Sequence, residues 1–158
     1  CYFKTYGLNV VFTNCSNNYG PHQHQEKLIP TVIRKALAGE PIPIYGTGQN
    51  IRDWLYVKDH CLAIELVFQK GRTGQSYNIG TNCEKNNLEL ATQICNILDQ
   101  KQPAKDTYTK QIQFVKDRAG HDFRYAIDAT KIKNELNWQP KYTFEKALEE
   151  TVEWYLNK

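Results

Sequence analysis

The sequence predicts a mixed α/β fold, on three observations. Short runs of β-branched and aromatic residues alternate with longer stretches in which apolar residues recur at helical spacing. Glycine and proline separate many of these segments. The 158 residues, 41% hydrophobic and 23% charged, are enough for one ordinary globular domain with a real core. We find no internal repeat and no obvious internal domain boundary.

The first residues resemble the end of a helix. Cys1 to Tyr6 are followed by Gly7, and glycine commonly ends a helix in the left-handed conformation. The chain contains no methionine, and its N-terminus lacks the pattern of a secretory signal peptide. We therefore expect the sequence to be a fragment, or a processed product, of a longer protein.

The next segment is the most informative. The apolar run Leu8–Phe12 predicts a buried strand, and the polar stretch Thr13–Pro21 follows it directly. In open α/β sheets, ligands bind just beyond the carboxyl ends of strands. The junction therefore predicts the edge of a binding site. If the chain is a fragment, this strand has lost its sheet partners, and we expect it to be displaced, disordered or paired with another chain.

From residue 27 to residue 80, helices alternate with short strands. Pro30 falls in the first turn of a helix, where its missing N–H is tolerated, and Gly39 and Gly71 end the two helices. The expected elements are a helix at Lys27–Ala38, an extended segment at Pro41–Tyr45, a turn at Gly46–Gly48, a strand at Ile51–Tyr56, a helix at Val57–Gln69 and a strand at Ser76–Ile79.

The last part of the chain is mainly helical. Asn86 and Glu89 have the spacing of a capping box, and Thr143 and Asp128 are placed to cap two later helices. The expected elements are a helix at Asn86–Leu98, a polar connection at Lys101–Lys110, a strand at Ile112–Val115, a helix at Ala129–Leu136 and a helix at Phe144–Leu156.

Charge and cysteine content exclude several classes of protein. The net charge of +3 is mild and no cluster of Lys and Arg reaches five residues, so we expect no nucleic-acid partner. No apolar stretch approaches the length of a membrane helix. The cysteines are odd in number and lack Cys-x-x-Cys spacing, which argues against a disulfide framework and a zinc site and favours a reducing compartment. We expect a cytoplasmic protein without a metal.

No catalytic set stands out. The four histidines are scattered, without a paired nucleophile motif. The turn Tyr45–Gly48 lacks the strand and helix that flank a dinucleotide-binding fingerprint, so a plain turn is the simpler interpretation.

Arg52 is the first candidate for a binding residue. It lies in an apolar strand context, where an unpaired charge is costly. One interpretation is a structural ion pair with Asp53 or Asp59. The other is a guanidinium fork that binds a phosphate group.

The segment Asp117–Asp128 gives a second candidate. It gathers Arg118, His121, Arg124 and Tyr125 around a glycine, either as a solvated loop or as a second cationic wall for the same anion. Two further motifs also have a purely structural interpretation. Asn17 and Asn18 can hydrogen-bond within their own turn, and Glu26–Lys27 can be ordinary helix-start residues. A lysine there is poorly placed for the helix dipole, which slightly favours a ligand role.

Together these residues suit an anion that carries a ring, such as a diphosphate joined to a sugar and a base. The motifs TNCSNNYGP, EKLIP, PIYGTGQNIRDWLYVKDH, YNIG, EKNNL, DRAGHDFRYAID and TVEWYL also resemble those of the dTDP-glucose 4,6-dehydratases, within the extended short-chain dehydrogenase/reductase family. The resemblance extends from Thr5 to Leu156.

The resemblance implies an α/β fold: the C-terminal substrate-binding lobe of an extended short-chain dehydrogenase plus the last elements of its Rossmann domain. Residues 1–26 would be the remnant of the NAD-binding domain. Residues 27–158 would form the nucleotide-sugar-binding lobe, with crossings back to the Rossmann sheet near residues 51–80. The full-length protein, a homodimer, would use NAD to convert dTDP-glucose to dTDP-4-keto-6-deoxyglucose through transient oxidation at C4.

The catalytic residues of the family lie upstream and match no position here, so the resemblance implies no catalytic residue in this chain and an inactive fragment. It implies a cofactor contact at Asn18. It implies substrate contacts at Asn17, Lys27, Leu28, Pro43, Ile44, Tyr45, Arg52, Asn87, Asp117, Arg118, Ala119, Gly120 and His121, of which Arg52 would bind the diphosphate and Asp117–His121 would close over the nucleotide.

Two departures leave substrate preference open. Ala119 stands where the family often has proline, which makes the loop less rigid. Gln23–Gln25 replace a more usual aromatic-proline approach to Glu26. The alternatives are a UDP- or GDP-sugar epimerase or dehydratase of the same family, and a nucleotide-sugar-binding module without turnover.

Overall fold

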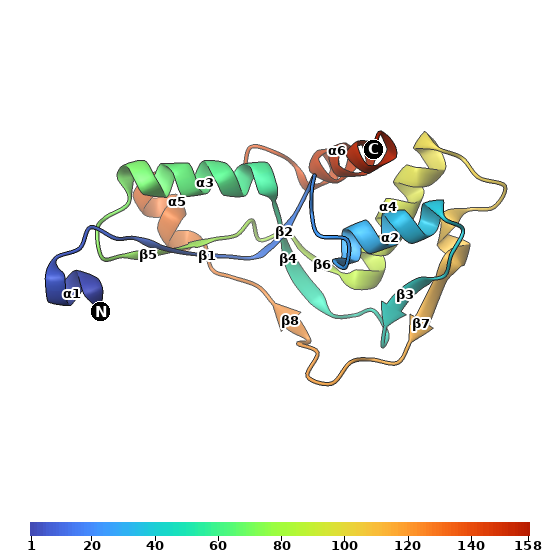
Figure 1. Cartoon of the computed structure of the whole chain (residues 1–158), viewed down its shortest axis with the longest axis horizontal. Coiled ribbons are helices and arrows are strands. Elements are labelled where there is room, and N and C mark those ends of the chain that lie inside the picture. Colours follow the sequence, from blue (N-terminus) through green and yellow to red (C-terminus); the bar gives the residue numbers. More distant parts are fainter.

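Three small sheets and six α-helices form an elongated α/β molecule in the computed structural model, which describes residues 1–158 (Figure 1). The strands are β1 (Phe12–Cys15), β2 (Asn17–Tyr19), β3 (Ile42–Tyr45), β4 (Ile51–Tyr56), β5 (Ser76–Ile79), β6 (Glu84–Asn86), β7 (Ile112–Val115) and β8 (Arg124–Tyr125). The helices are α1 (Tyr2–Tyr6), α2 (Leu28–Leu37), α3 (Val57–Lys70), α4 (Asn87–Lys101), α5 (Thr130–Leu136) and α6 (Phe144–Leu156), with a 3₁₀ turn at Tyr108–Gln111.

The first strand differs from the prediction in position and in partner. β1 begins at Phe12, where the predicted strand was to end, and it is largely exposed. It pairs in parallel with β5 of the same chain in a two-stranded sheet, so the expectation that it would be displaced, disordered or paired with another chain was wrong. A mainly apolar run suggests a buried strand, whereas this segment packs on one side only. Val11 and Cys15 contact a core, while Leu8 and Phe12 face outward.

β4 is the central element of the fold. It pairs in parallel with β2 and β8 and antiparallel with β6. Successive side chains of a strand point to opposite faces. Trp54 and Tyr56 accordingly join one hydrophobic core, and Leu55 joins another. β4 therefore separates two cores.

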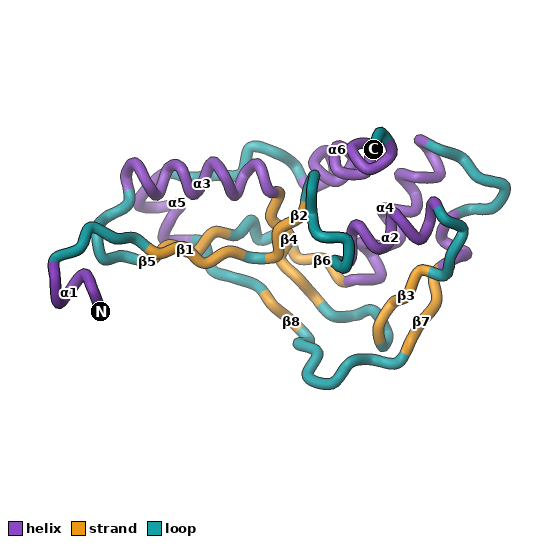
Figure 2. The backbone as a smooth tube through the Cα atoms, in the orientation of Figure 1, coloured by secondary structure: helices purple, strands orange, loops and turns teal.

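The larger core contains 19 buried residues, contributed mainly by α2, α4, α6 and the strands β2, β3 and β4. The smaller core contains 8 buried residues, contributed by β4, α3, β5, α5 and the segment around Trp138. Helix α3 lies along the β1–β5 pair, and α2, α4 and α6 gather at the other end of the molecule (Figures 1 and 2).

Most element ends follow local rules. Asn86 and Glu89 form the predicted capping box, Thr143 caps α6, and Gly7 ends α1 with φ 65°. Asp128 was predicted to cap α5, but Ala129 occupies the N-cap, and the Asp128 carboxylate accepts a hydrogen bond from the Thr130 amide at 2.8 Å. The short strands β6 and β8 were not predicted, because only distant pairing with β4 defines them.

Candidate functional site

Arg52 is held in place on β4 by backbone oxygens. Its Nη1 donates to the carbonyl of Ile51 at 2.7 Å, and its Nη2 donates to the carbonyl of Asp122 at 2.9 Å. The side chain is half-buried, and no carboxylate lies within ion-pair distance of it. The positive charge of Arg52 is therefore available to a ligand.

The structural ion pair considered from the sequence is wrong, because both carboxylates are buried and engaged elsewhere. Asp53 accepts hydrogen bonds from the backbone and hydroxyl of Thr81 and from the backbone of Cys83. Asp59 accepts from the backbone amides of Lys141 and Tyr142. Each carboxylate fastens a loop, and neither neutralises Arg52.

The loop Asp117–His121 closes on itself. The carboxylate of Asp117 interacts with Nδ1 of His121 at 2.7 Å and accepts from the backbone amide of Arg118 at 2.9 Å. The hydrogen bond with His121 holds the pKa of Asp117 below its usual value. The His121 side chain is 5% exposed although its loop is open to solvent, so the ring anchors the loop.

This loop lies against the end of β3 and the start of β4 (Figure 2). The ring of Tyr45 meets His121 edge-on, with centroids 6.5 Å apart. Gly46 has φ +58°, and a Cβ there would lie 2.9 Å from the Asp117 carboxylate, so only glycine fits this approach. Asn50 donates from Nδ2 to the carbonyl of Asp122 at 3.1 Å.

Asn87 joins the same place from α4. Its backbone amide donates to the carbonyl of Asn50 at 3.2 Å, and the amide of Leu88 donates to the carbonyl of Gly48 at 3.1 Å. Tyr45, Arg52, Asn87 and the loop Asp117–His121 are thus brought to one place, although they are far apart in the sequence. Arg118, Ala119 and Gly120 are exposed within that loop.

The two asparagines of β2 have different environments. The Oδ1 of Asn18 lies 2.7 Å from Nδ1 of His60, and its Nδ2 donates to the Ser16 carbonyl and the Cys15 sulfur. Burial lowers the pKa of His60, which favours the neutral ring. Nδ2 of Asn17, by contrast, is buried and has no partner. Asn17 is therefore the one with unused hydrogen-bonding capacity.

The remaining predicted residues lie on α2 and β3. Lys27 is the exposed N-cap of α2, and no hydrogen bond or ion pair joins its side chain to the others. Leu28 and Pro43 are half-buried. Ile44 is 1% exposed and belongs to the larger core, so its side chain supports β3 rather than facing a ligand.

Sequence reasoning missed His60 and Asn50 as supports of this site. His60 contacts Asn18 across 42 positions, and Asn50 contacts Asp122 across 72. Both residues lie in the motif PIYGTGQNIRDWLYVKDH, but nothing local in it assigns them a partner.

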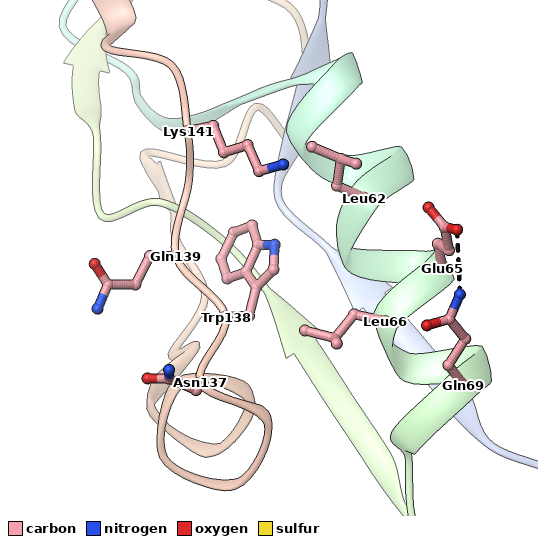
Figure 3. Close-up of a pocket in the computed structure, with 8 residues that line it drawn as sticks. All are labelled: Leu62, Glu65, Leu66, Gln69, Asn137, Trp138, Gln139 and Lys141. Atoms are coloured by element: carbon pink, nitrogen blue, oxygen red, sulfur yellow. Dashed lines mark hydrogen bonds between the residues drawn. The ribbon is translucent and has the colours of Figure 1, made fainter.

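An open cavity of about 340 Å³ lies elsewhere, between α3 and the segment after α5 (Figure 3). Leu62, Leu66 and Trp138 form its apolar part, and a Gln69–Glu65 hydrogen bond of 3.2 Å crosses its rim. None of the predicted site residues lines this cavity, and its only charged lining residues are Glu65 and Lys141.

Cys83 and Cys95 are not reactive thiols, and the chain has no candidate metal centre. Burial raises the pKa of Cys83 and Cys95 to about 11, so both thiols stay protonated near neutral pH. All five cysteines are free, and no group of three His, Cys, Asp or Glu side chains is placed to hold a metal. None of the helices combines the length and apolar composition needed to cross a bilayer.

The parallel strand pairs and the polar groups at their ends define an α/β protein with the architecture of the extended short-chain dehydrogenases, as predicted. A family model described as GDP-mannose 4,6 dehydratase matches residues 1–151, and the chain belongs to that family.

Curated relatives support the resemblance seen in the motifs. A dTDP-glucose 4,6-dehydratase of Xanthomonas campestris is 57% identical over 157 residues, covering 98% of this chain and 45% of that protein. One of Haemophilus influenzae is 56% identical, covering 97% and 46% respectively. The resemblance is confirmed. The chain spans less than half the length of these relatives.

Solved structures agree. A dTDP-glucose 4,6-dehydratase of Bacillus anthracis in complex with NAD matches with a TM-score of 0.89 and 54% identity, covering 99% of this chain and 48% of that one. A Streptomyces venezuelae dTDP-glucose 4,6-dehydratase with NAD and dTDP bound matches with a TM-score of 0.88 and 43% identity, covering 99% and 47%. A UDP-glucose 4-epimerase of Thermotoga maritima has the same TM-score, 0.88, at 28% identity, covering 99% and 48%.

Proposed function

We propose that the protein containing this chain is an NAD-dependent dTDP-glucose 4,6-dehydratase, and that this chain supplies most of the nucleotide-sugar site. The observation that carries the proposal is the half-buried Arg52, which has no carboxylate partner and donates to the carbonyl of Asp122, the residue after the loop Asp117–His121. Asn50 also donates to Asp122 and accepts from the backbone amide of Asn87, and Tyr45 meets His121 edge-on. The relatives at 56–57% identity and the dTDP found in a solved relative support the thymidine diphosphate sugar as substrate.

The residues of this chain bind and enclose the substrate. Arg52 grips the diphosphate, Tyr45 and its neighbours on β3 line the base, and the loop Asp117–His121 covers the nucleotide. Asn17 contacts the substrate from β2, with Lys27, Leu28 and Asn87 completing its surroundings. By covering the nucleotide, the loop excludes water from the site. The ionic contacts to the diphosphate are stronger there, because water would screen them.

NAD fits this chain only at an edge. Asn18 is half-buried at the end of β2, but its carboxamide is already held by His60, Ser16 and Cys15. The turn at Gly46–Gly48 leads to β4 rather than to a helix, so it offers no phosphate-binding loop. Bound NAD would supply hydride transfer from C4 of the sugar and its return to C6, with water eliminated across C5 and C6.

The division of the chain is also a proposal. Residues 1–26 would belong to the NAD-binding domain and residues 27–158 to the nucleotide-sugar lobe, with crossings near residues 51–80. The parallel pairing of β1 with β5 supports such a crossing. We further propose a cytoplasmic homodimer, for which the five free cysteines support the reducing location.

The test uses the full-length protein with dTDP-glucose, UDP-glucose and GDP-mannose as separate substrates. We expect NAD-dependent loss of water from dTDP-glucose, and mass spectrometry of the product measures this loss. Turnover of a UDP- or GDP-sugar in preference to dTDP-glucose would replace the proposal with another nucleotide-sugar enzyme. Binding without turnover would indicate a non-catalytic module.

Arg52→Ala tests the site itself. We expect dTDP binding, measured by calorimetry, to weaken by about 2–5 kcal/mol, because the diphosphate loses its charged partner. Arg52→Lys should recover part of the loss, since a lysine keeps the charge but not the planar fork. Arg34→Ala, an exposed arginine of α2, is the control and should bind dTDP normally. Unchanged binding in Arg52→Ala would exclude this site.

A further inference from the structure

Two cations face each other across β4 and β6. Arg52 and Lys85 are register partners in this antiparallel pair, so their side chains leave the same face of the sheet. Neither forms an ion pair with a carboxylate. Lys85 instead has its ammonium 5.8 Å from the centre of the Phe144 ring, on the side of the larger core. Like charges directly opposite each other destabilise a strand pair, and an anion between them would remove that penalty.

Two buried donors without partners lie next to these cations. Trp54 follows Arg52 by two positions on β4 and therefore shares its face, and its Nε1–H is buried without an acceptor. Asn17 is the register partner of Trp54 on β2, and its Nδ2 is likewise buried without an acceptor. Tyr19, two residues after Asn17, packs in the larger core, which confirms that this is the same face.

An unpaired buried donor is rare, because the group loses its hydrogen bonds to water and gains none. Here two such donors and two unpaired cations occupy adjoining positions on three neighbouring strands. All four groups are hydrogen-bond donors, and Arg52 and Lys85 also carry a positive charge that no carboxylate neutralises. The ligand chemistry that matches them is a diphosphate, with several anionic oxygens spaced along a short chain.

We propose that Lys85 and Trp54 are diphosphate-binding residues that act with Arg52 and Asn17, and we call these four residues the donor row. The proposal rests on the proposed function, since it assigns the donor row to the diphosphate of that substrate. Lys85 supplies a second positive charge opposite Arg52. Trp54 supplies an N–H between the cations and Asn17.

The donor row predicts that substitutions weaken ligand binding without weakening the free protein. In the free protein, Lys85→Gln removes repulsion and Trp54→Phe removes an unsatisfied donor. Neither change costs a hydrogen bond that the free protein makes. In the complex, each variant loses one hydrogen bond to a charged acceptor, which corresponds to about tenfold to a hundredfold weaker binding. Residues with purely structural roles would lower stability and leave binding intact.

The experiment measures dTDP binding by calorimetry and the melting temperature without ligand, in the full-length protein loaded with NAD. Two matched controls come from the smaller core. Lys131 also has its ammonium over an aromatic ring, 4.9 Å from the centre of Tyr77, and Trp138 has the same 6% exposure as Trp54. The indole nitrogen of Trp138 is not among the buried atoms that lack a partner.

We expect Lys85→Gln to bind dTDP about tenfold to a hundredfold more weakly. Its melting temperature should fall no more than that of Lys131→Gln, which also removes an ammonium from an aromatic ring. Trp54→Phe should weaken binding similarly, and its melting temperature should fall no more than that of Trp138→Phe. Lys131→Gln and Trp138→Phe should bind dTDP like the wild type.

Normal dTDP affinity in both Lys85→Gln and Trp54→Phe would overturn the donor row while leaving the proposed function intact. A wild-type protein that fails to bind dTDP would overturn both, and the two failures are thereby distinguished. Should Trp54→Phe not fold, replacement by β-(3-benzothienyl)alanine, which exchanges the indole N–H for sulfur at nearly constant shape, gives the same test.

Discussion

The larger and the smaller core share β4 but differ in how far they are closed. Helices α2, α4 and α6 enclose the larger core together with β2, β3 and β4. The smaller core has fewer buried residues, and aromatic side chains near it remain exposed, with Phe68 of α3 at 85% and Phe12 of β1 at 58%. The closed core is also the one whose surface strands carry Arg52 and Asn17. A binding site needs rigid support, and the larger core provides it.

The largest expected effect tests this difference in closure. Ile94→Ala in α4 empties a fully buried position of the larger core and should lower the free energy of unfolding by about 2–5 kcal/mol. Ile132→Ala in α5 is the matched change, since Ile132 is also 0% exposed. We expect it to lie at the lower end of that range, because a more open surrounding relaxes more easily around a cavity. Urea denaturation measures both, and equal losses would refute the comparison.

The next effect concerns the loop fastened behind β4. The amide of Thr81 donates to one carboxylate oxygen of Asp53 and the amide of Cys83 to the other, so Asp53→Asn places an NH₂ group against one of these two amides. We expect a loss of about 1–3 kcal/mol in unfolding free energy, because a buried donor is left without an acceptor. Hydrogen exchange should show faster opening at residues 81–83 than in α2. Uniform exchange across the chain would show that Asp53 stabilises the whole fold rather than this loop.

The smallest effect lies at the contact between α3 and β2. Burial lowers the folded-state pKa of His60 below its unfolded value. The unfolded chain therefore takes up the proton first, so this contribution to stability is complete above the ordinary histidine pKa and is lost as pH falls through the folded-state pKa. His60→Gln should flatten the decline in stability that sets in as pH falls below the ordinary histidine pKa. If the stability of the variant falls with pH as steeply as that of the wild type, the decline is caused by other titrating groups.

The sequence predicted the elements whose cause is local. The capping box of α4 was predicted because Asn86 and Glu89 are only three residues apart, and the helix α2 because its apolar stripe is continuous. The site was predicted in part from residue type, since an arginine inside a strand requires an explanation. Its partners could not be derived from residue pattern alone, because Asp122 and His60 reach Arg52 and Asn18 only through the folded chain.

The predicted bounds of the first strand were wrong for the same reason, namely that they depend on a distant part of the chain. An apolar run indicates a strand, but its boundaries depend on where the partner strand begins. β5 fixes Phe12 as the first paired residue by register with Ser76. The strand therefore includes Asn14, a residue type that is depleted in strands, and extends beyond the apolar run.

The parallel pairing of β1 with β5 also has a consequence for biosynthesis. The partners are 64 residues apart, as in the contact between Asn14 and Asn78. At a synthesis rate of roughly 5–20 residues per second, β5 is made about 3–13 s after β1. During that interval β1 has no partner from this segment, and the apolar residues before it stay uncovered. Nascent chains stalled before β5 should therefore bind chaperones more strongly than chains released after it.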